Sequence, residues 1–130
     1  MTSYLLDTHV WLWLQTTPER IRDEVVDLLA DRANTVLLSA ASSWEIAIKY
    51  RLGKLPLPEP PAEYVPERMR LSGVAALPVE HAHALRVADL PEHHGDPFDR
   101  LIIAQAQSLN VAIVTADGQF RAYEVETVHA

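Results

Sequence analysis

The sequence predicts a three-layer α/β fold, in which helices cover both faces of a mostly parallel central sheet. Short, nearly continuous apolar runs alternate with longer stretches in which apolar residues recur at helical spacing. Strands without polar alternation are typical of parallel sheets that are buried on both faces. No internal repeat or low-complexity tract interrupts the 130 residues, so we expect a single domain over residues 1–130.

The N-terminal quarter is expected to begin with a strand and two helices. Residues 4–6 form an apolar run that ends at Asp7, and apolar residues then repeat at helical spacing over 10–14. A second helix is expected from about 19 to 31, because Pro18 is a favourable first residue and apolar side chains follow on one face.

A second strand and helix should follow. Residues 35–38 are apolar and predict a buried strand, and residues 39–43 offer several helix caps. The helix should cover 44–50 and end at Gly53, a residue that favours the left-handed conformation found after helices. Four prolines within 55–61 predict an extended connection.

The middle of the chain is expected to contain shorter elements. We predict a short helix over 62–71, a short strand over 74–79, a helix over 80–88 and a loop at 93–95.

The last helix and the last two strands are marked clearly in the sequence. Asp96 and Pro97 form an N-cap followed by a first-turn proline, and apolar residues over 98–105 share one helical face. Residues 111–114 predict a buried strand, and a brief helix and a final strand near 126–128 complete the expected fold.

Composition and charge limit the classes of function. The 18 acidic and 11 basic residues give a net charge of −7, which excludes a protein that coats nucleic acid by charge alone. An enzyme that acts on nucleic acid stays open, because metal ions in an acidic pocket reverse the local charge. The absence of cysteine excludes disulfides, thiolate metal sites and thiol nucleophiles. With neither a signal-peptide pattern nor an apolar run of membrane length, we expect a cytoplasmic protein.

Four acidic residues lie at the ends of predicted elements. Asp7 and Asp117 each follow an apolar run, Glu45 lies about one turn into a helix, and Asp99 lies in the first turn of another. Ligands of open α/β sheets bind beyond the carboxyl ends of the strands, where all four side chains can meet. Crowded carboxylates repel one another unless a cation neutralises them, and such oxygen ligands suit Mg²⁺ or Mn²⁺.

Each acid also has a purely structural interpretation. Asp7 and Asp117 can cap helices, Asp96 can form a capping arrangement with the aspartate three residues later, and Glu45 can pair with Lys49 at i+4. The six histidines have no spacing that indicates a triad or a zinc site, so surface or cap roles are expected for His9, His81, His83, His93, His94 and His129.

Four ordered stretches carry a resemblance to a known family. They are LLDTH at 5–9, SWEIAIK at 43–49, DPFDRLIIAQA at 96–106 and VTAD at 114–117. From Leu5 to about Phe120 the chain resembles the PIN domain, and more narrowly the VapC-type toxin ribonucleases of bacterial type II toxin–antitoxin pairs. The resemblance implies a PIN-like fold and an endoribonuclease that uses Mg²⁺ or Mn²⁺.

The resemblance also implies roles for individual residues. It places the acidic quartet of the family, which is both catalytic and metal-binding, on Asp7, Glu45, Asp99 and Asp117, with Thr115 as a supporting hydroxyl. Asp96 lies on the same helical face as Asp99 and either assists the metal or acts only as an N-cap. Lys49 and Arg100 either contact substrate phosphate or are solvated charges.

The reaction that the resemblance implies is metal-assisted hydrolysis of RNA, which leaves a 5′-phosphate and a 3′-hydroxyl. The implied partners are an RNA substrate, a VapB-like antitoxin and a second copy of the chain. Apolar side chains at Trp11, Trp13 and Trp44, with Leu12 and Leu14, indicate either a fully packed core helix or an apolar groove or dimer surface for these partners.

Two other classes of protein compete with this interpretation. A receiver-like phosphorylation domain has a similar length and an acidic metal pocket, but it would require an acidic pair after the first strand and a lysine after the last. Asp7 is followed by Thr8 and His9, and the only lysines are Lys49 and Lys54. An inactive PIN-like binding module would be favoured by a missing acid, and all four are present.

Overall fold

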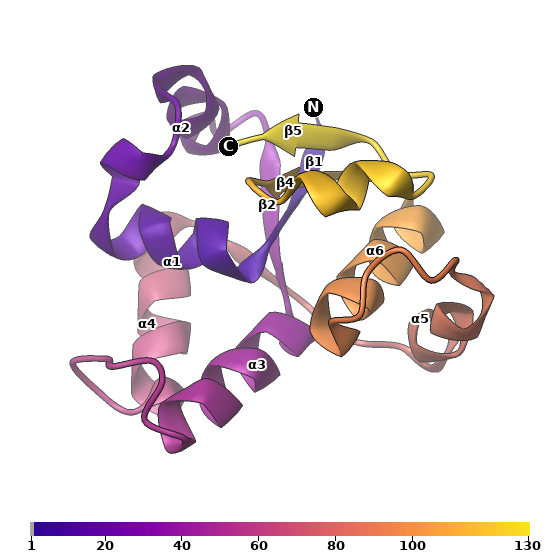
Figure 1. Ribbon diagram of the computed structural model, residues 1–130. Coiled ribbons are helices and arrows are strands. Elements are labelled where there is room, and N and C mark those ends of the chain that lie inside the picture. The colour runs from indigo at the N-terminus through magenta and orange to yellow at the C-terminus, as the bar shows by residue number, and fades with distance from the viewer. Residues whose placement is uncertain (1) are drawn as a thin grey trace.

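A five-stranded sheet lies at the centre of the computed structural model, which describes residues 2–130 (Figure 1). The strands run in the spatial order β3-β2-β1-β4-β5, and each neighbouring pair is parallel. Their bounds are Ser3–Leu6 for β1, Thr35–Ser39 for β2, Ala75–Leu77 for β3, Ala112–Thr115 for β4 and Thr127–His129 for β5. The expected α/β architecture is confirmed, with a sheet that is wholly parallel in these five strands.

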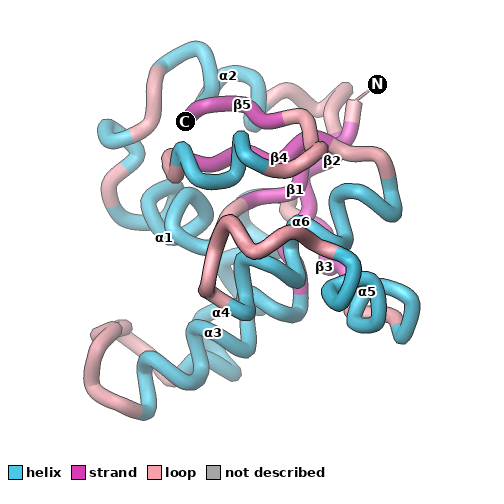
Figure 2. Tube along the Cα trace, turned by 45° about the vertical axis from the view of Figure 1, so that its right-hand side comes forward, coloured by secondary structure: helices cyan, strands magenta, loops and turns pink. Residues whose placement is uncertain are grey.

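Helices connect successive strands. The α-helices are α1 Thr8–Thr16, α2 Asp23–Ala30, α3 Ala40–Arg51, α4 Pro61–Ser72, α5 His81–Arg86 and α6 Pro97–Leu109. Three short 3₁₀ segments, η1 Pro18–Arg20, η2 Val87–Asp89 and η3 Gly118–Ala122, complete the fold. The loop between α3 and α4 projects from the body of the molecule (Figure 2). Within residues 2–130, no helix combines the length and the apolar character needed to cross a membrane.

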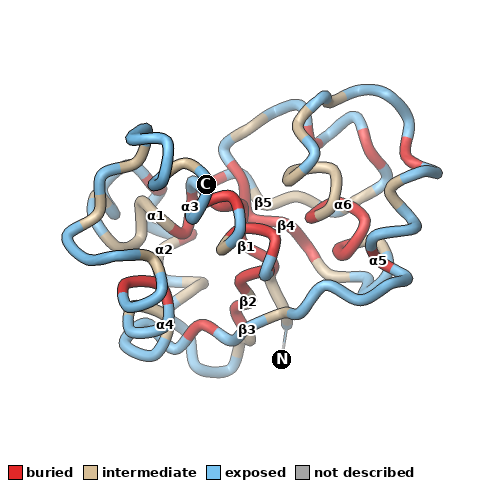
Figure 3. The backbone as a smooth tube through the Cα atoms, turned by 90° about the horizontal axis from the view of Figure 1, so that it is seen from below, coloured by how far each residue is buried: buried red, intermediate tan, exposed pale blue. Residues whose placement is uncertain are grey.

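The sheet separates two apolar cores. Helices α1, α2 and α4 lie on one side of the sheet and α5 and α6 on the other (Figure 1). Adjacent strand residues point to opposite sides, so Leu6 and Val114 belong to one core while Leu5 and Ile113 belong to the other. The buried stretches of β1 and β4 run through the middle of the molecule (Figure 3). These two buried strands therefore position the residues that follow their carboxyl ends.

The predicted helix over 19–31 is wrong in its first part. The chain forms η1 and then becomes extended at Ile21, and α2 begins only at Asp23. The Ile21 side chain is buried in the core, and the guanidinium of Arg22 donates hydrogen bonds to the carbonyl of His129. Tertiary contacts therefore interrupt a stretch whose local pattern favours a continuous helix.

Other boundaries differ by a few residues. The third helix begins at Ala40, earlier than predicted, because the hydroxyl of Ser39 accepts a hydrogen bond from the backbone N–H of Ala41 and caps it directly after β2. The strand expected over 74–79 is limited to Ala75–Leu77 at the edge of the sheet.

The strand order excludes the receiver alternative. Receiver domains have the order 2-1-3-4-5, whereas the chain has 3-2-1-4-5. In the observed order, the chain moves from β1 to β2 and then to β3 in one direction along the sheet. It then crosses back to β4 and β5, which lie beyond β1 in the other direction. Ligands of such sheets bind in the crevice at the carboxyl ends where the order reverses. The predicted binding position is therefore the crevice between β1 and β4.

Candidate metal and catalytic site

Four acidic side chains gather at this crevice. Asp7 directly follows β1, Asp117 follows β4, Glu45 lies inside α3 and Asp99 lies in the first turn of α6. Burial, followed by repulsion from carboxylates that include the other three, raises the pKa of Asp99. The structure thus brings together the four acids that the sequence singles out, from four separate elements.

Asp7 is held by the neighbouring strand. Its backbone N–H donates to the carbonyl of Val114, and its Oδ2 accepts a hydrogen bond from the Thr115 hydroxyl over 2.8 Å. The same hydroxyl accepts from the backbone N–H of Asp117 at 3.0 Å, so Thr115 links two of the acids. Asp7 stands at the N-cap position of α1 but makes no side-chain cap bond. Capping therefore does not explain this residue.

Glu45 lies inside α3, and its side chain is almost completely buried. The residue is 2% exposed, and its Oε2 forms an ion pair of 2.6 Å with Lys49 one turn later. A hydrogen bond between the hydroxyls of Thr8 and Ser42 ties α1 to α3 one turn before Glu45. The expected pairing with Lys49 is present, but it occupies only one oxygen.

Asp99 and Asp117 are joined by a histidine. The Nε2 of His94 lies 3.0 Å from Oδ2 of Asp99 and 3.1 Å from Oδ2 of Asp117. Its Nδ1 accepts the backbone N–H of Asp96 at 3.2 Å, which leaves Nε2 to carry the proton in the neutral ring. Asp117 also accepts a hydrogen bond from the N–H of Gln119 and so caps η3, as its structural interpretation predicted.

His94 is the site residue that the sequence analysis missed. The expectation of a surface or cap role is wrong for this histidine, because its side chain is largely buried between the two carboxylates and packs edge-on against Phe120. The available signal was its position two residues before the N-cap Asp96. That position fixes Nδ1 but does not reveal that Asp117, 23 residues later, lies beside Nε2.

Burial and like charges shift the acidities at the site. Burial, followed by repulsion from the other carboxylates, raises the pKa of Asp99 to about 8. Burial also raises the pKa of Asp7, against the opposing effect of the Thr115 hydrogen bond. The hydrogen bond to Glu45 raises the pKa of Lys49. Without a cation, the protein therefore disfavours the charged forms of Asp7 and Asp99.

The residues fit a divalent cation. Oδ1 of Asp7 and Oε1 of Glu45 are buried and have no hydrogen-bond partner in the described part of the chain. Leaving such oxygens unpaired is costly, and an oxygen-seeking cation would satisfy both. On the outer side, ligand atoms of His94, Asp99 and Asp117 lie within 4.8 Å of one another. The donor set is rich in carboxylate oxygen, as Mg²⁺ and Mn²⁺ prefer.

Two of the three residues with open alternatives, Asp96 and Arg100, are used structurally. Oδ1 of Asp96 accepts hydrogen bonds from the N–H groups of Phe98 and Asp99, which confirms its role as the N-cap of α6. The guanidinium of Arg100 donates to the backbone carbonyls of Val87, Leu90, Pro91 and His94 and to the Tyr123 hydroxyl. These bonds tie the loop before α6 to the fold, and we therefore do not propose Arg100 as a phosphate ligand.

The tryptophans divide between the two alternatives. Trp11 is fully buried, and Leu12, Trp13 and Leu14 pack against the same core, so α1 is a packed core helix. Trp44 is 59% exposed and touches Phe98 edge-on. With Ile48 and Leu52 it forms an exposed apolar stripe along α3, at intervals of four residues.

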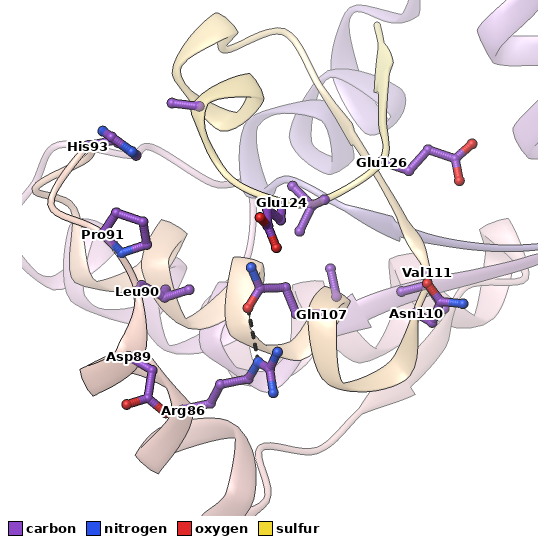
Figure 4. A pocket seen from close by; sticks show the side chains of 13 residues that line it. Arg86, Asp89, Leu90, Pro91, His93, Gln107, Asn110, Val111, Glu124 and Glu126 are labelled. Atoms are coloured by element: carbon purple, nitrogen blue, oxygen red, sulfur yellow. Dashed lines mark hydrogen bonds between the residues drawn. The ribbon is translucent and has the colours of Figure 1, made fainter.

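Two pockets differ in their relation to the acids. A cavity of about 670 Å³ lies among η2, the C-terminal half of α6 and the chain that leads to β5, where Arg86 hydrogen bonds to Gln107 (Figure 4). It contains none of the four acids. A smaller pocket of about 290 Å³ lies between α1 and α3 and shares Glu45 with the acidic cluster. The smaller pocket is therefore the one next to the candidate chemistry.

Comparisons with known proteins agree with this geometry. The chain is 61% identical to Ribonuclease VapC16 of Mycobacterium tuberculosis over 61 residues, which are 47% of this chain and 43% of that protein. It is 29% identical to Ribonuclease VapC22 of the same organism over 126 residues, which are 95% of this chain and 93% of that protein. The first alignment thus spans less than half of the relative.

Solved structures agree at the level of the fold. The crystal structure of VapBC2 from Rickettsia felis bound to a promoter DNA fragment matches with a TM-score of 0.73, over 98% of each chain and at 17% identity. The family model of the PIN domain matches residues 4–126. With this match across nearly the whole chain, a sheet in the order 3-2-1-4-5 and four acids at its switch point, the chain belongs to the PIN domain family.

Proposed function

We propose that the chain is an endoribonuclease dependent on Mg²⁺ or Mn²⁺, and that it is the toxin of a type II toxin–antitoxin pair. The observation that carries the proposal is the pair of buried, unpartnered oxygens on Asp7 and Glu45, next to the carboxylates of Asp99 and Asp117. A fold has no structural use for such a cluster, because it destabilises the metal-free protein. The names of the relatives, both ribonucleases, support RNA as the substrate.

The bound metal would supply positive charge for the phosphate and would lower the pKa of a water, so that the water can lose a proton and attack phosphorus. Asp7, Glu45, Asp99 and Asp117 would hold the metal, and Thr115 keeps Asp7 in place by donating to Oδ2. The attack forms a bond from water oxygen to phosphorus and breaks the bond to the 3′-oxygen, which takes up a proton. The products carry a 5′-phosphate and a 3′-hydroxyl. No covalent nucleophile takes part.

The partner proposals rest on surface and charge. The similar structure from Rickettsia felis contains a VapBC complex, which supports a VapB-like antitoxin for this chain. The exposed stripe of Trp44, Ile48 and Leu52 on α3 supports an interface with the antitoxin or with a second copy in a homodimer. The net charge of −7 favours a basic antitoxin segment. Because its substrate would be cellular RNA, we propose a cytoplasmic location.

Cleavage of total RNA tests the enzymatic proposal. The purified chain is incubated with total bacterial RNA in EDTA, Mg²⁺ or Mn²⁺, and new 5′ ends are sequenced by a method that requires a 5′-phosphate. We expect defined new ends in metal and none in EDTA, and Asp7→Asn should produce none under any condition. Equal cleavage in EDTA, or by Asp7→Asn, would contradict the proposal. Specific RNA binding without any new ends would instead favour the inactive binding module.

Growth assays test the biological role. Induction of the chain alone should arrest bacterial growth, and co-expression of the small protein encoded beside it should restore growth. Asp7→Asn retains the size of the side chain while removing its charge, so it should not arrest growth. Arrest that persists with Asp7→Asn would mean that toxicity arises from something other than RNA hydrolysis.

A further inference from the structure

The pocket beside Glu45 has an unusual charge for this molecule. The sequence contains only two lysines, Lys49 and Lys54, and both line the 290 Å³ pocket. The chain as a whole carries a net charge of −7. A pocket that collects every lysine of an acidic protein, directly next to its acidic cluster, has the composition expected for an anion.

The helix end brings the lysines together. Helix α3 ends in a Schellman motif, with Gly53 in the left-handed conformation at φ 75°. The N–H of Lys54 donates to the carbonyl of Lys49 over 2.9 Å, and the N–H of Gly53 donates to the carbonyl of Tyr50. These two bonds turn the chain back over its last turn.

The positions that carry the lysines are informative. In this motif an apolar contact commonly joins the residue after the glycine to the last turn of the helix. Here both positions are cationic, and both side chains line the pocket instead. Lys49 is partly neutralised by Glu45, whereas Lys54 forms no ion pair within residues 2–130. The pair therefore offers at least one cation for a ligand.

The pocket has an apolar floor beneath these charges. Leu12 of α1, Ile46 of α3 and Leu55 of the following loop line it. Its volume of about 290 Å³ is at the lower limit of ligand pockets, so it holds one sugar–base unit and not a long strand. A nucleotide combines an anionic phosphate with a less polar sugar and base, which matches a cationic rim above an apolar floor. A basic protein segment would meet repulsion from Lys54, which forms no ion pair within residues 2–130.

We propose that this pocket is the subsite for the nucleotide next to the scissile phosphodiester. Lys54, with Lys49, binds the phosphate of that nucleotide, and the partly exposed Leu12 and Leu55 contact its sugar and base. Glu45 belongs to both the pocket and the acidic cluster, so a strand bound here continues directly to the cutting position. The inference rests on the proposed function, because it takes RNA as the substrate.

The test compares Lys54→Gln with Arg51→Gln. Both residues are exposed at the same end of α3, but Arg51 does not line the pocket, so the pair controls for net charge and for the helix dipole. Affinity for a fluorescein-labelled ten-nucleotide RNA is measured between 50 and 200 mM KCl, in an Asp7→Asn background that prevents cleavage. We expect Lys54→Gln to weaken binding about two- to fivefold, as for one exposed ion pair, and to reduce the salt slope by about 0.7.

A second measurement tests the apolar floor. RNAs that each carry one abasic site, at successive positions, are compared with intact RNA. At one of these positions the abasic site should weaken binding to the parent protein. In Leu55→Ser this difference should disappear, because the two changes remove the two sides of one contact. If the abasic site weakens RNA binding by Leu55→Ser as much as it weakens binding by the parent protein, Leu55 and the base do not touch.

The outcomes separate the subsite from the proposed function. Equal affinities and equal salt slopes for Lys54→Gln and Arg51→Gln overturn the subsite, even if the wild type cleaves RNA. A wild type that never cleaves, combined with a reduced slope for Lys54→Gln alone, overturns the nuclease but supports the pocket as an RNA-binding site of a protein that does not cleave. If Lys54→Gln leaves RNA binding unchanged but weakens binding of the protein encoded beside the chain, the pocket is a protein site and the inference is wrong.

Discussion

The inner and outer halves of the acidic cluster satisfy their carboxylates differently. Asp7 and Glu45 form the inner half, where the residues are 4% and 2% exposed and each keeps one buried oxygen without a partner. Asp99 and Asp117 form the outer half, where the side chains are 15% and 34% exposed and a histidine N–H lies between them. In the inner half, Lys49 pairs with one oxygen of Glu45 and the Thr115 hydroxyl donates to one oxygen of Asp7, but the second oxygens have no partner. In the outer half, His94 contacts both carboxylates.

The difference follows from the elements that carry the residues. The inner acids stand at a strand end and inside a helix, where one buried oxygen of each has no hydrogen-bond partner in the described part of the chain. The outer acids stand where α6 and η3 begin, next to the loop that carries His94. Burial of the inner acids leaves one oxygen of each without a donor, whereas the loop that carries His94 brings a ring nitrogen to both outer acids.

The largest expected effect comes from the inner half. Asp7→Asn should reduce metal-dependent RNA cleavage by at least about 100-fold, the upper range for lost partners of a metal site. Asp117→Asn, in the outer half, should lose about 10-fold, because solvent and His94 can compensate. Rates measured at saturating Mn²⁺ provide the comparison. Equal losses in the two variants would remove the distinction between the halves.

Metal binding should be visible in the stability of the same variants. Mg²⁺ or Mn²⁺ should raise the melting temperature of the wild type by mass action on the folded state. The increase should be absent in Asp7→Asn and should fade at acidic pH, where protonated carboxyls bind metal poorly. In EDTA, Asp7→Asn should be at least as stable as the wild type because a charge is relieved. A clear loss of stability there would point to a structural role.

The next effect concerns the pH dependence of the metal-free protein. The pKa of Asp99 is raised from 3.8 to about 8, so the folded state binds this proton more tightly than the unfolded chain. The resulting stability is complete below about pH 4 and is lost as pH rises through 8. One pKa unit corresponds to about 1.4 kcal/mol, so the total is on the order of a few kcal/mol.

Asp99→Asn isolates this contribution. The free energy of unfolding is measured by denaturant titration in EDTA at pH 5.5 and at pH 8.5, for wild type and variant. Relative to the variant, the wild type should lose stability between the two pH values, and subtracting the variant removes most of the effect of the other titrating groups. A difference that does not change with pH would show that Asp99 is ionised without cost.

A smaller effect is expected at the histidine of the outer half. His94→Ala should weaken Mn²⁺ binding about tenfold, as expected for a group that orients metal-binding carboxylates. His94→Gln should recover part of this loss, because its amide can still donate to a carboxylate. His93→Ala is the matched control, since its side chain faces Tyr123 and does not contact the acids. Tighter Mn²⁺ binding by His94→Ala in calorimetry would show that the ring competes with the metal.

The smallest effect tests the boundary of the cluster. Asp96→Ala should cost about 0.5–2 kcal/mol of stability through the lost cap of α6. Asp96→Ser retains a capping oxygen without the carboxylate, so it should restore stability and leave Mn²⁺ affinity unchanged. If Asp96→Ser restores stability but lowers Mn²⁺ affinity, Asp96 belongs to the metal site after all.

The sequence by itself determined the features that depend on short windows. The apolar runs of β1 and β4, the Asp96–Pro97 start of α6 and the positions of Asp7, Asp99 and Asp117 at the ends of elements were predictable, because burial and capping leave local patterns. The resemblance in four ordered motifs added the family, which the PIN domain match confirmed. The single-domain expectation and the roles of the acids stay predictions.

Only the tertiary structure decided the features that join distant segments. The extended break at Ile21 is fixed by core burial and by Arg22 at the carbonyl of His129, and neither is visible in the local pattern. The position of His94 between two acids and the partners of Arg100 likewise depend on how loops dock against the sheet. A side chain's neighbours across the fold are set by packing of whole elements, and a short stretch of sequence contains no record of them.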